Sequence, residues 1–144
     1  MSLEENKVVA RRLYEEVITG GNEHVIPEIL TEDYRLNMAG NPEPMDLAGV
    51  SQFIATFRTA FPDLSDSPED MVAEGTKVAV RGVMRGTHQG DFMGIPATGK
   101  HVTASWIAIL EMQDGRIREV WLSFDMLGMM QQLGVVPAPE GAPA

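Results

Sequence analysis

The chain has 144 residues, a formal net charge of −10, 44% apolar residues and 22% charged residues. This length and composition are typical of one globular domain that buries its own core, not of a disordered or fibrous protein. The acidic charge opposes binding to phosphates, so we expect no nucleic-acid partner. The chain has no cysteine, which excludes disulfides and thiolate metal sites and is compatible with a reducing cytoplasm.

The hydrophobic pattern predicts no contact with a membrane. No run of 18 or more apolar residues occurs, whereas a spanning helix needs about 20. The chain starts with acidic residues, where a signal peptide would be basic and then apolar. We therefore expect a cytoplasmic protein.

The N-terminal segment has the pattern of an amphipathic helix over residues 3–19. Ser2 and Glu5 have the spacing of a capping box, and Gly20 and Gly21 provide a stop. Asn22 is a candidate N-cap for a short second helix. A short strand is predicted next over residues 34–37, followed by a loop rich in glycine and proline over residues 39–44.

A third helix is predicted after this loop, with Asp46 as its N-cap. Its apolar residues recur at helical spacing until Pro62 ends the pattern. They are Val50, Phe53, Ile54, Phe57 and Phe61.

From Glu69 onward the hydrophobic period changes to two, which indicates strands. Residues 71–73 and 77–85 flank a short turn and predict a hairpin. Residues 87–100 contain four glycines and one proline and predict a long connection. Residues 102–112 form the longest strand candidate, and the Asp-Gly turn after it predicts that residues 115–125 run back antiparallel.

The last strand divides its side chains between two faces, because alternate residues share a face. We expect one face to line a cavity, with Asp125 as its acid. This face comprises Ile117, Glu119, Trp121, Ser123 and Asp125. We expect the other face to pack against a subunit or a neighbouring layer. It comprises Val120, Leu122 and Phe124.

The C-terminal segment is predicted to be helical or half-extended over residues 127–133, and residues 135–144 form a flexible tail rich in proline and alanine. Residues 1–134 then form a single domain. Helices followed by antiparallel strands predict an α+β fold, in which the helices cover one face of a curved sheet.

Several motifs, taken in order, resemble the SnoaL-like polyketide cyclase family, whose cone-shaped fold is shared with nuclear transport factor 2 and ketosteroid isomerase. The resemblance covers nearly the whole chain. It rests on Phe61-Pro-Asp-Leu64, Val72-Ala-Glu-Gly75, Arg81 before Gly86-Thr-His88, Gly94-Ile-Pro-Ala-Thr-Gly-Lys100, and Glu119-Val-Trp121 with Asp125 ahead of Gln132-Leu-Gly134.

The resemblance implies a curved antiparallel sheet wrapped around N-terminal helices, a cone with an apolar pocket, and a homo-oligomer packing through the sheet, for which we expect a homodimer. It also implies an intramolecular aldol condensation without metal or organic cofactor. In the family an aspartate at the end of the last strand serves as acid and base, and the matching position is Asp125. A fold is shared more widely than a substrate, so the substrate does not follow from it.

Asp125 has two interpretations. As a catalytic acid and base it would need apolar surroundings that raise its pKa toward neutrality. As the N-cap of a helix starting at Met126 it would accept backbone N–H bonds, which lower the pKa.

His88 could lie at the rim of the pocket and hydrogen-bond a substrate carbonyl or enolate oxygen, or it could be a loop histidine bonded to the backbone. The three histidines of the chain lack metal-ligand spacing, so we expect no metal site.

Arg81 is external if the Val78, Val80 and Met84 face lines the pocket. If the other face does, Arg81 could bind an anionic group or pair with Glu119, and the ion pair is the preferred alternative.

Further candidates for contact with a substrate are, apart from Asn37, apolar or aromatic, and these could equally be core residues. They are Trp121, Tyr34, Asn37, Phe57, Phe61, Trp106 and Met126, of which Asn37 could also be a plain turn residue.

The function that this sequence favours is a cofactor-independent cyclase acting on a small apolar, polyketide-like carbonyl compound, with Asp125 and His88 in the mechanism. The alternatives are an isomerase or epoxide hydrolase in the same cone, and a noncatalytic binding or dimerisation module. Epoxide hydrolysis would need an Asp-Arg-Asp arrangement around a water, which the sequence does not assemble.

Overall fold

The structure, a computed structural model, describes residues 2–137. The described residues form one five-stranded sheet in the order β1-β5-β4-β3-β2, in which neighbouring strands are antiparallel except β1 and β5, which are parallel. The strands are β1 (Leu30–Met38), β2 (Ser65–Glu74), β3 (Lys77–Thr87), β4 (His101–Gln113) and β5 (Arg116–Phe124). The predicted α+β class is confirmed, with one parallel pair added. None of the described helices has the length and apolar character needed to cross a membrane.

The first predicted helix is confirmed, but it changes type halfway. Helix α1 (Leu3–Arg12) starts with the expected capping box of Ser2 and Glu5. It continues without a break into the π-helix η1 (Leu13–Thr19). π-Helical turns are rare and occur often at functional sites. This one carries three side chains into the pocket described below.

The second helix is shorter than predicted and the strand after it is longer. The 3₁₀-helix η2 (Glu23–Val25) leads into α2 (Ile26–Ile29), and β1 (Leu30–Met38) follows at once. The prediction that Asn22 caps this helix is wrong, since its side chain makes no capping hydrogen bond. The strand starts early because Leu30 already pairs with β5.

Helix α3 (Leu47–Ala60) confirms the third predicted helix and its N-cap. The Asp46 carboxylate accepts a hydrogen bond from the Gly49 backbone N–H at 2.8 Å. Its apolar stripe faces β1 and the interior, and the chain leaves the helix at Phe61, before Pro62.

The remaining strands confirm both predicted hairpins. Strands β2 (Ser65–Glu74) and β3 (Lys77–Thr87) pair antiparallel, as do β4 (His101–Gln113) and β5 (Arg116–Phe124). Strand β2 starts four residues before the predicted change of period. The connection over residues 88–100 contains no helix or strand, as predicted.

The prediction about the two faces of β5 is wrong, because a β-bulge interrupts the alternation. Glu119 pairs with Glu111 and Ile117 pairs with Met112, so Arg118 is an extra residue on β5. A bulge shifts every later side chain to the opposite face. Ile117 is therefore buried on the same side as Val120, whereas Trp121 lies on the outer face.

Helix α4 (Met126–Leu133) confirms the helical alternative for the C-terminal segment, and it packs against β4. Gln132 on this helix bonds the part of β4 that lies beyond its pairing with β5, where the Gln132 side-chain amide accepts from the Thr103 N–H and donates to the Thr103 carbonyl, both at 2.8 Å. Most of the predicted flexible tail, residues 138–144, lies outside the described residues.

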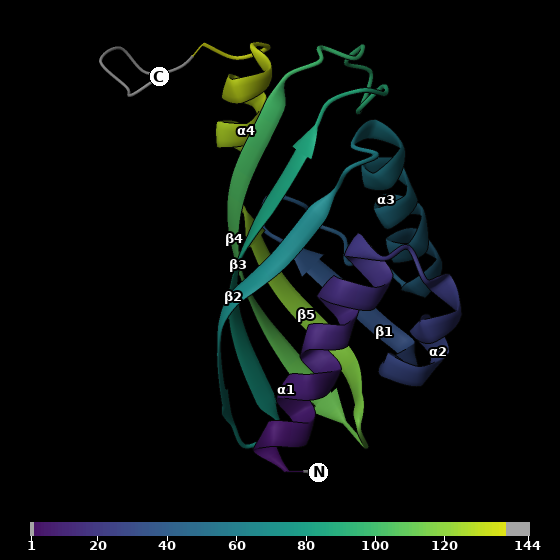
Figure 1. Cartoon of the computed structure of the whole chain (residues 1–144). Coiled ribbons are helices and arrows are strands. Elements are labelled where there is room, and N and C mark those ends of the chain that lie inside the picture. Colours follow the sequence, from purple (N-terminus) through teal and green to yellow (C-terminus); the bar gives the residue numbers. More distant parts are fainter. Residues whose placement is uncertain (1, 138–144) are drawn as a thin grey trace.

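The core lies between the helices and the inner face of the sheet. Figure 1 shows α1, α2 and α3 on one side of the curved sheet, with α4 beside the upper part of β4. Helix α1 packs against β2, β3 and β5, and α3 packs against β1. The arrangement leaves the other face of the sheet uncovered by any described helix except α4.

Candidate active site

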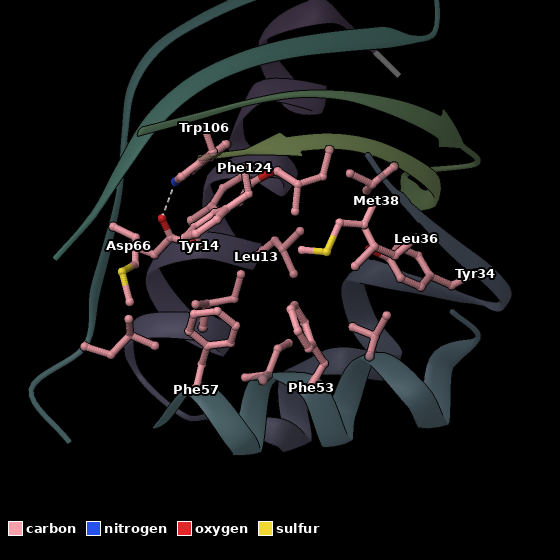
Figure 2. A pocket seen from close by; sticks show the side chains of 17 residues that line it. Leu13, Tyr14, Tyr34, Leu36, Met38, Phe53, Phe57, Asp66, Trp106 and Phe124 are labelled. Atoms are coloured by element: carbon pink, nitrogen blue, oxygen red, sulfur yellow. Dashed lines mark hydrogen bonds between the residues drawn. The ribbon is translucent and has the colours of Figure 1, made fainter. Parts of the chain in front are cut away.

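An apolar pocket opens between α3, η1 and the inner face of the sheet (Figure 2). Asp66 and Trp106 lie at one end of it, and Tyr34 and Leu36 lie at the other. The lining residues are Leu13, Tyr14, Ile18, Tyr34, Leu36, Met38, Val50, Phe53, Ile54, Phe57, Leu64, Asp66, Met84, Trp106, Val120, Leu122 and Phe124.

Asp66 is the one carboxylic acid among these lining residues, and no lysine, arginine or histidine joins it there. It lies on β2 opposite Met84 of β3. The indole Nε1–H of Trp106 donates a 2.6 Å hydrogen bond to Asp66 Oδ1. The other carboxylate oxygen, Oδ2, makes no hydrogen bond with any residue of the described chain and keeps some accessible surface.

Burial raises the pKa of the Asp66 carboxyl from its ordinary value of 3.8 to about 7, against a lowering by the Trp106 hydrogen bond. An apolar environment penalises the charged form, and a donor to the carboxylate favours it. At neutral pH both protonation states of Asp66 are therefore populated. A group of this kind can accept a proton and later return it.

Two phenols complete the polar groups of the pocket. Burial raises the pKa of both Tyr14 and Tyr34, and the nearby Asp66 charge adds to the effect on Tyr14. Both phenols consequently stay protonated near neutral pH. Neither phenol forms a hydrogen bond with another residue between 2 and 137, although both are buried. They are free to donate to the oxygen of a ligand.

Local packing explains why Asp66 and Trp106 meet. Trp106 on β4 faces Gly82 on β3, and the missing side chain of Gly82 leaves room for the indole ring to lie against the strand. The indole also stacks on Tyr14, with ring centroids 4.5 Å apart. The Asp66 backbone N–H donates to the Thr19 hydroxyl at 2.9 Å, which ties β2 to the end of η1.

Three of the sequence-predicted substrate contacts line the pocket, namely Tyr34, Phe57 and Trp106. Phe61 is fully buried next to it, stacked on Phe57 with ring centroids 6.1 Å apart. It supports the pocket wall without lining the pocket.

Asp125 lies outside the pocket-lining set and is exposed. Its Oδ1 accepts a 2.9 Å hydrogen bond from the Gly128 N–H at the start of α4. The geometry is that of the capping alternative. The bulge at Arg118 explains the placement, because it turns Val120, Leu122 and Phe124 toward the pocket in place of the Asp125 face.

His88 is buried, but it is not brought to the pocket. The Thr98 N–H donates to its Nδ1 at 3.2 Å, and its ring lies beside Phe61 with centroids 5.5 Å apart. These contacts match the alternative of a histidine bonded to the backbone. Across residues 2–137 no three histidine or acidic side chains gather as metal ligands.

The other predicted contacts lie away from the pocket. Trp121 is 42% exposed on the outer face. Asn37, on the same face, donates to Glu119 Oε2 at 2.9 Å.

Arg81 is also external, because the Val78 and Met84 face is the inner one. The preferred Arg81–Glu119 ion pair is not formed, since Glu119 is two strands away and contacts Arg118 at 3.6 Å. Met126 packs against the core from α4.

Sequence reasoning missed Asp66 and Tyr14. Asp66 stands in Ser65-Asp-Ser-Pro68, which resembles a turn. A usable signal was the alternation of Leu64, Asp66 and Pro68, which places the acid on the face of an apolar residue. Tyr14 falls at helical spacing with the apolar residues of the first helix, a pattern that predicts only a core residue, and its stacking partner Trp106 is distant in sequence.

Comparison with known proteins adds independent information. The model of the SnoaL-like polyketide cyclase family matches residues 8–133. The aklanonic acid methyl ester cyclase DauD of Streptomyces sp. strain C5 is 32% identical over 138 residues, covering 92% of this chain and 84% of the relative.

Two crystal structures have the same fold as this chain. AclR from Streptomyces galilaeus has a TM-score of 0.85 at 26% identity and covers 96% of this chain and 87% of its own. IdmH from Streptomyces antibioticus has a TM-score of 0.80 at 31% identity, and the match covers 90% of this chain and 98% of IdmH. The matches therefore extend over the helices and the sheet that build the pocket.

Proposed function

Because the chain belongs to the SnoaL-like polyketide cyclase family, we propose that it is a cofactor-independent cyclase. In this proposal an apolar, polyketide-like carbonyl compound enters the pocket and closes a ring by enolisation and intramolecular aldol addition. The family supports the reaction class, and the pocket supports the kind of substrate.

The observation that carries the proposal is the composition of the pocket wall. Among the described residues that line it, only Asp66, Tyr14, Tyr34 and Trp106 bring polar side-chain atoms. Such a wall excludes water around a reactive enolate and binds apolar rings by burial of their surface. We propose that Tyr34, Phe57 and Trp106 contact the substrate.

The free volume of the pocket is about 90 Å³, which is smaller than an extended multi-ring molecule needs. Lining side chains must therefore move when such a substrate enters. Met38 and Met84 are suited to this, since unbranched methionines change shape at low cost.

Ring closure of aklanonic acid methyl ester, the substrate in the name of DauD, is a direct test. The purified protein is incubated with the ester, and the product is followed by liquid chromatography and mass spectrometry as an isomer of unchanged mass. Thermal shift with this ester, 2-tetralone and a steroid 3-ketone tests binding in parallel, because a ligand of the folded state raises the melting temperature.

A matched pair of variants connects the activity to the pocket. Met38→Trp fills the pocket and should lower turnover by about tenfold or more, whereas Leu127→Trp adds the same bulk at an exposed site on α4. Absence of both binding and conversion for all three compounds would favour a noncatalytic module.

We also propose a homodimer formed through the outer face of the sheet, the opposite face from the one expected from the sequence. The large apolar side chains exposed there are Val72 (64%), Ile107 (59%), Ile109 (43%) and Trp121 (42%). Strand pairing sets Ile109 beside Trp121, so the apolar surface is continuous across strands. A second copy would cover it by the same patch on each subunit.

Light scattering tests the dimer. Ile109→Lys should give a monomer, whereas Val8→Lys, at a more exposed apolar residue of α1, should leave the assembly unchanged. A monomeric parent protein contradicts the dimer. A cytoplasmic location stays a prediction.

A further inference from the structure

We propose that Asp66 is the acid and base of the pocket, and that Trp106 is the positioning residue that leaves one Asp66 oxygen free for the substrate. This inference rests on the proposed function. It moves the chemistry from the end of β5, where the sequence placed it, to β2.

Asp66 faces the pocket from the inner side of β2, between Leu64 and Met84, which also line it. A substrate inside this pocket meets no other carboxylate from the described chain. By contrast, Asp125 is exposed and commits Oδ1 to the Gly128 N–H.

Three elements hold Asp66 in place. It pairs with Met84 on β3, its backbone N–H donates to Thr19 on η1, and its Oδ1 accepts from Trp106 on β4. The Trp106 ring is itself held between Gly82 and Tyr14. A base fixed on three sides presents Oδ2 in one direction, which is what efficient proton transfer from carbon requires.

The titratable groups that face Asp66 across the pocket are the phenols of Tyr14 on η1 and Tyr34 on β1, both neutral near pH 7, and the described lining carries no cation. Nothing in the pocket wall forces the carboxyl to stay ionised. The acid can thus take up a proton and release it within one catalytic cycle.

The reaction balances without a co-reactant. Asp66 Oδ2 takes a proton from the carbon next to a carbonyl, and the C–H electron pair forms the enolate. The enolate carbon then bonds to a second carbonyl carbon of the same molecule, and the first carbonyl reforms. The electron pair of the second carbonyl moves to its oxygen, and Asp66 returns the proton to that oxygen. The phenol O–H groups of Tyr14 and Tyr34 are available to stabilise the oxygen charge.

Two probes test the assignment on the full chain. Exchange of the C1 protons of 2-tetralone in D₂O, followed by proton NMR, reports enolisation alone. Ring closure of aklanonic acid methyl ester reports the whole reaction. We expect Asp66→Asn to lower both rates by about 100-fold or more, the range of general base catalysis. Asp70→Asn, an exposed acid on the same strand, should stay within about twofold of the parent protein.

The pH dependence of the 2-tetralone exchange rate tests the role of Trp106. The rate of the parent protein should rise with pH through about 7, as the Asp66 carboxyl ionises. Trp106→Phe removes the donor to the carboxylate, so the rising limb should move to higher pH. A loss of rate without a shift of this limb would make Trp106 a structural residue only.

The outcomes separate the two proposals. An active parent protein with a fully active, folded Asp66→Asn variant overturns the assignment of Asp66 and leaves the proposed function intact. A parent protein inactive on both probes overturns the proposed function itself. Circular dichroism verifies folding, and the pH limb of Trp106→Phe provides evidence that does not depend on Asp66→Asn.

Discussion

Trp106 lies against Gly82, its cross-strand partner on β3, and this contact sends the indole Nε1–H to Asp66 on β2. A Cβ atom on residue 82 would overlap Cζ2 of the indole. Gly82 thus sets the position of the indole, and through it the hydrogen bond to the Asp66 carboxyl, which lies two strands from Trp106. In this chain the geometry of the site depends on a residue with no functional group.

We expect Gly82→Ala to destabilise the protein by about 1–3 kcal/mol, the range for overpacking a filled interior. The displaced indole should also weaken its hydrogen bond to Asp66. Urea denaturation measures the stability. In a Trp106→Leu background the same substitution should cost much less, because the overlapping ring atoms are gone. Equal costs in both backgrounds would contradict the packing account.

The buried carboxyl of Asp66 makes stability depend on pH. Its pKa is raised in the folded state from 3.8 to about 7. Between these values the unfolded chain binds fewer protons than the folded one, so this group lowers the stability as pH rises from about 4 to 7 and has no effect below 4. Asp66→Asn removes the carboxyl and keeps an acceptor for Trp106.

We therefore expect Asp66→Asn to have a higher free energy of unfolding in urea than the parent protein at pH 8, by on the order of 1–3 kcal/mol. This advantage should disappear near pH 4. Asp70→Asn, an exposed acid on β2, is the control. A stabilised but inactive variant would be the pattern expected of a functional residue held at a cost to stability. An advantage that is the same at both pH values would have another origin.

Much of the fold follows from local patterns in the sequence. The stripe from Val50 to Phe57 defines α3, and the Asp114-Gly115 turn sets the last hairpin. These signals are local, and local signals survive in the folded chain.

The active site follows less well, because it depends on two features that the sequence pattern hides. A single extra residue, Arg118, reverses the faces of β5. Regular alternation therefore predicts the wrong face for every residue of the strand after it. Asp66 gains its role only through Trp106, 40 positions later in the chain. Pairing over such a distance is set by strand register, which is fixed by the whole sheet.

The bulge itself can be tested by deletion of Arg118. Removal of this extra residue leaves Ile117 and Val120 two positions apart, so regular alternation keeps Ile117, Val120, Leu122 and Phe124 on the inner face. We therefore expect the deletion to cost little stability in urea. Deletion of Trp121 is the contrast, because it turns Leu122 and Phe124 away from the pocket, and loss of one large aliphatic side chain from a core costs about 2–5 kcal/mol. A strongly destabilised Arg118 deletion would mean that the extra residue does more than reverse the faces of the strand.

Two substitutions of Asp125 distinguish helix capping from catalysis at this position. Alanine at this position removes the acceptor for the Gly128 N–H, and N-cap losses of this kind cost about 1 kcal/mol. Asparagine caps a helix nearly as well, so Asp125→Asn should retain the melting temperature that Asp125→Ala loses. Thermal denaturation measures both. If the carboxylate serves only as a cap, Asp125→Asn should also retain the rate of 2-tetralone exchange, because an amide still holds the start of α4. A folded Asp125→Asn protein with exchange lowered about 100-fold would instead return the base to the end of β5, as the sequence motif first indicated.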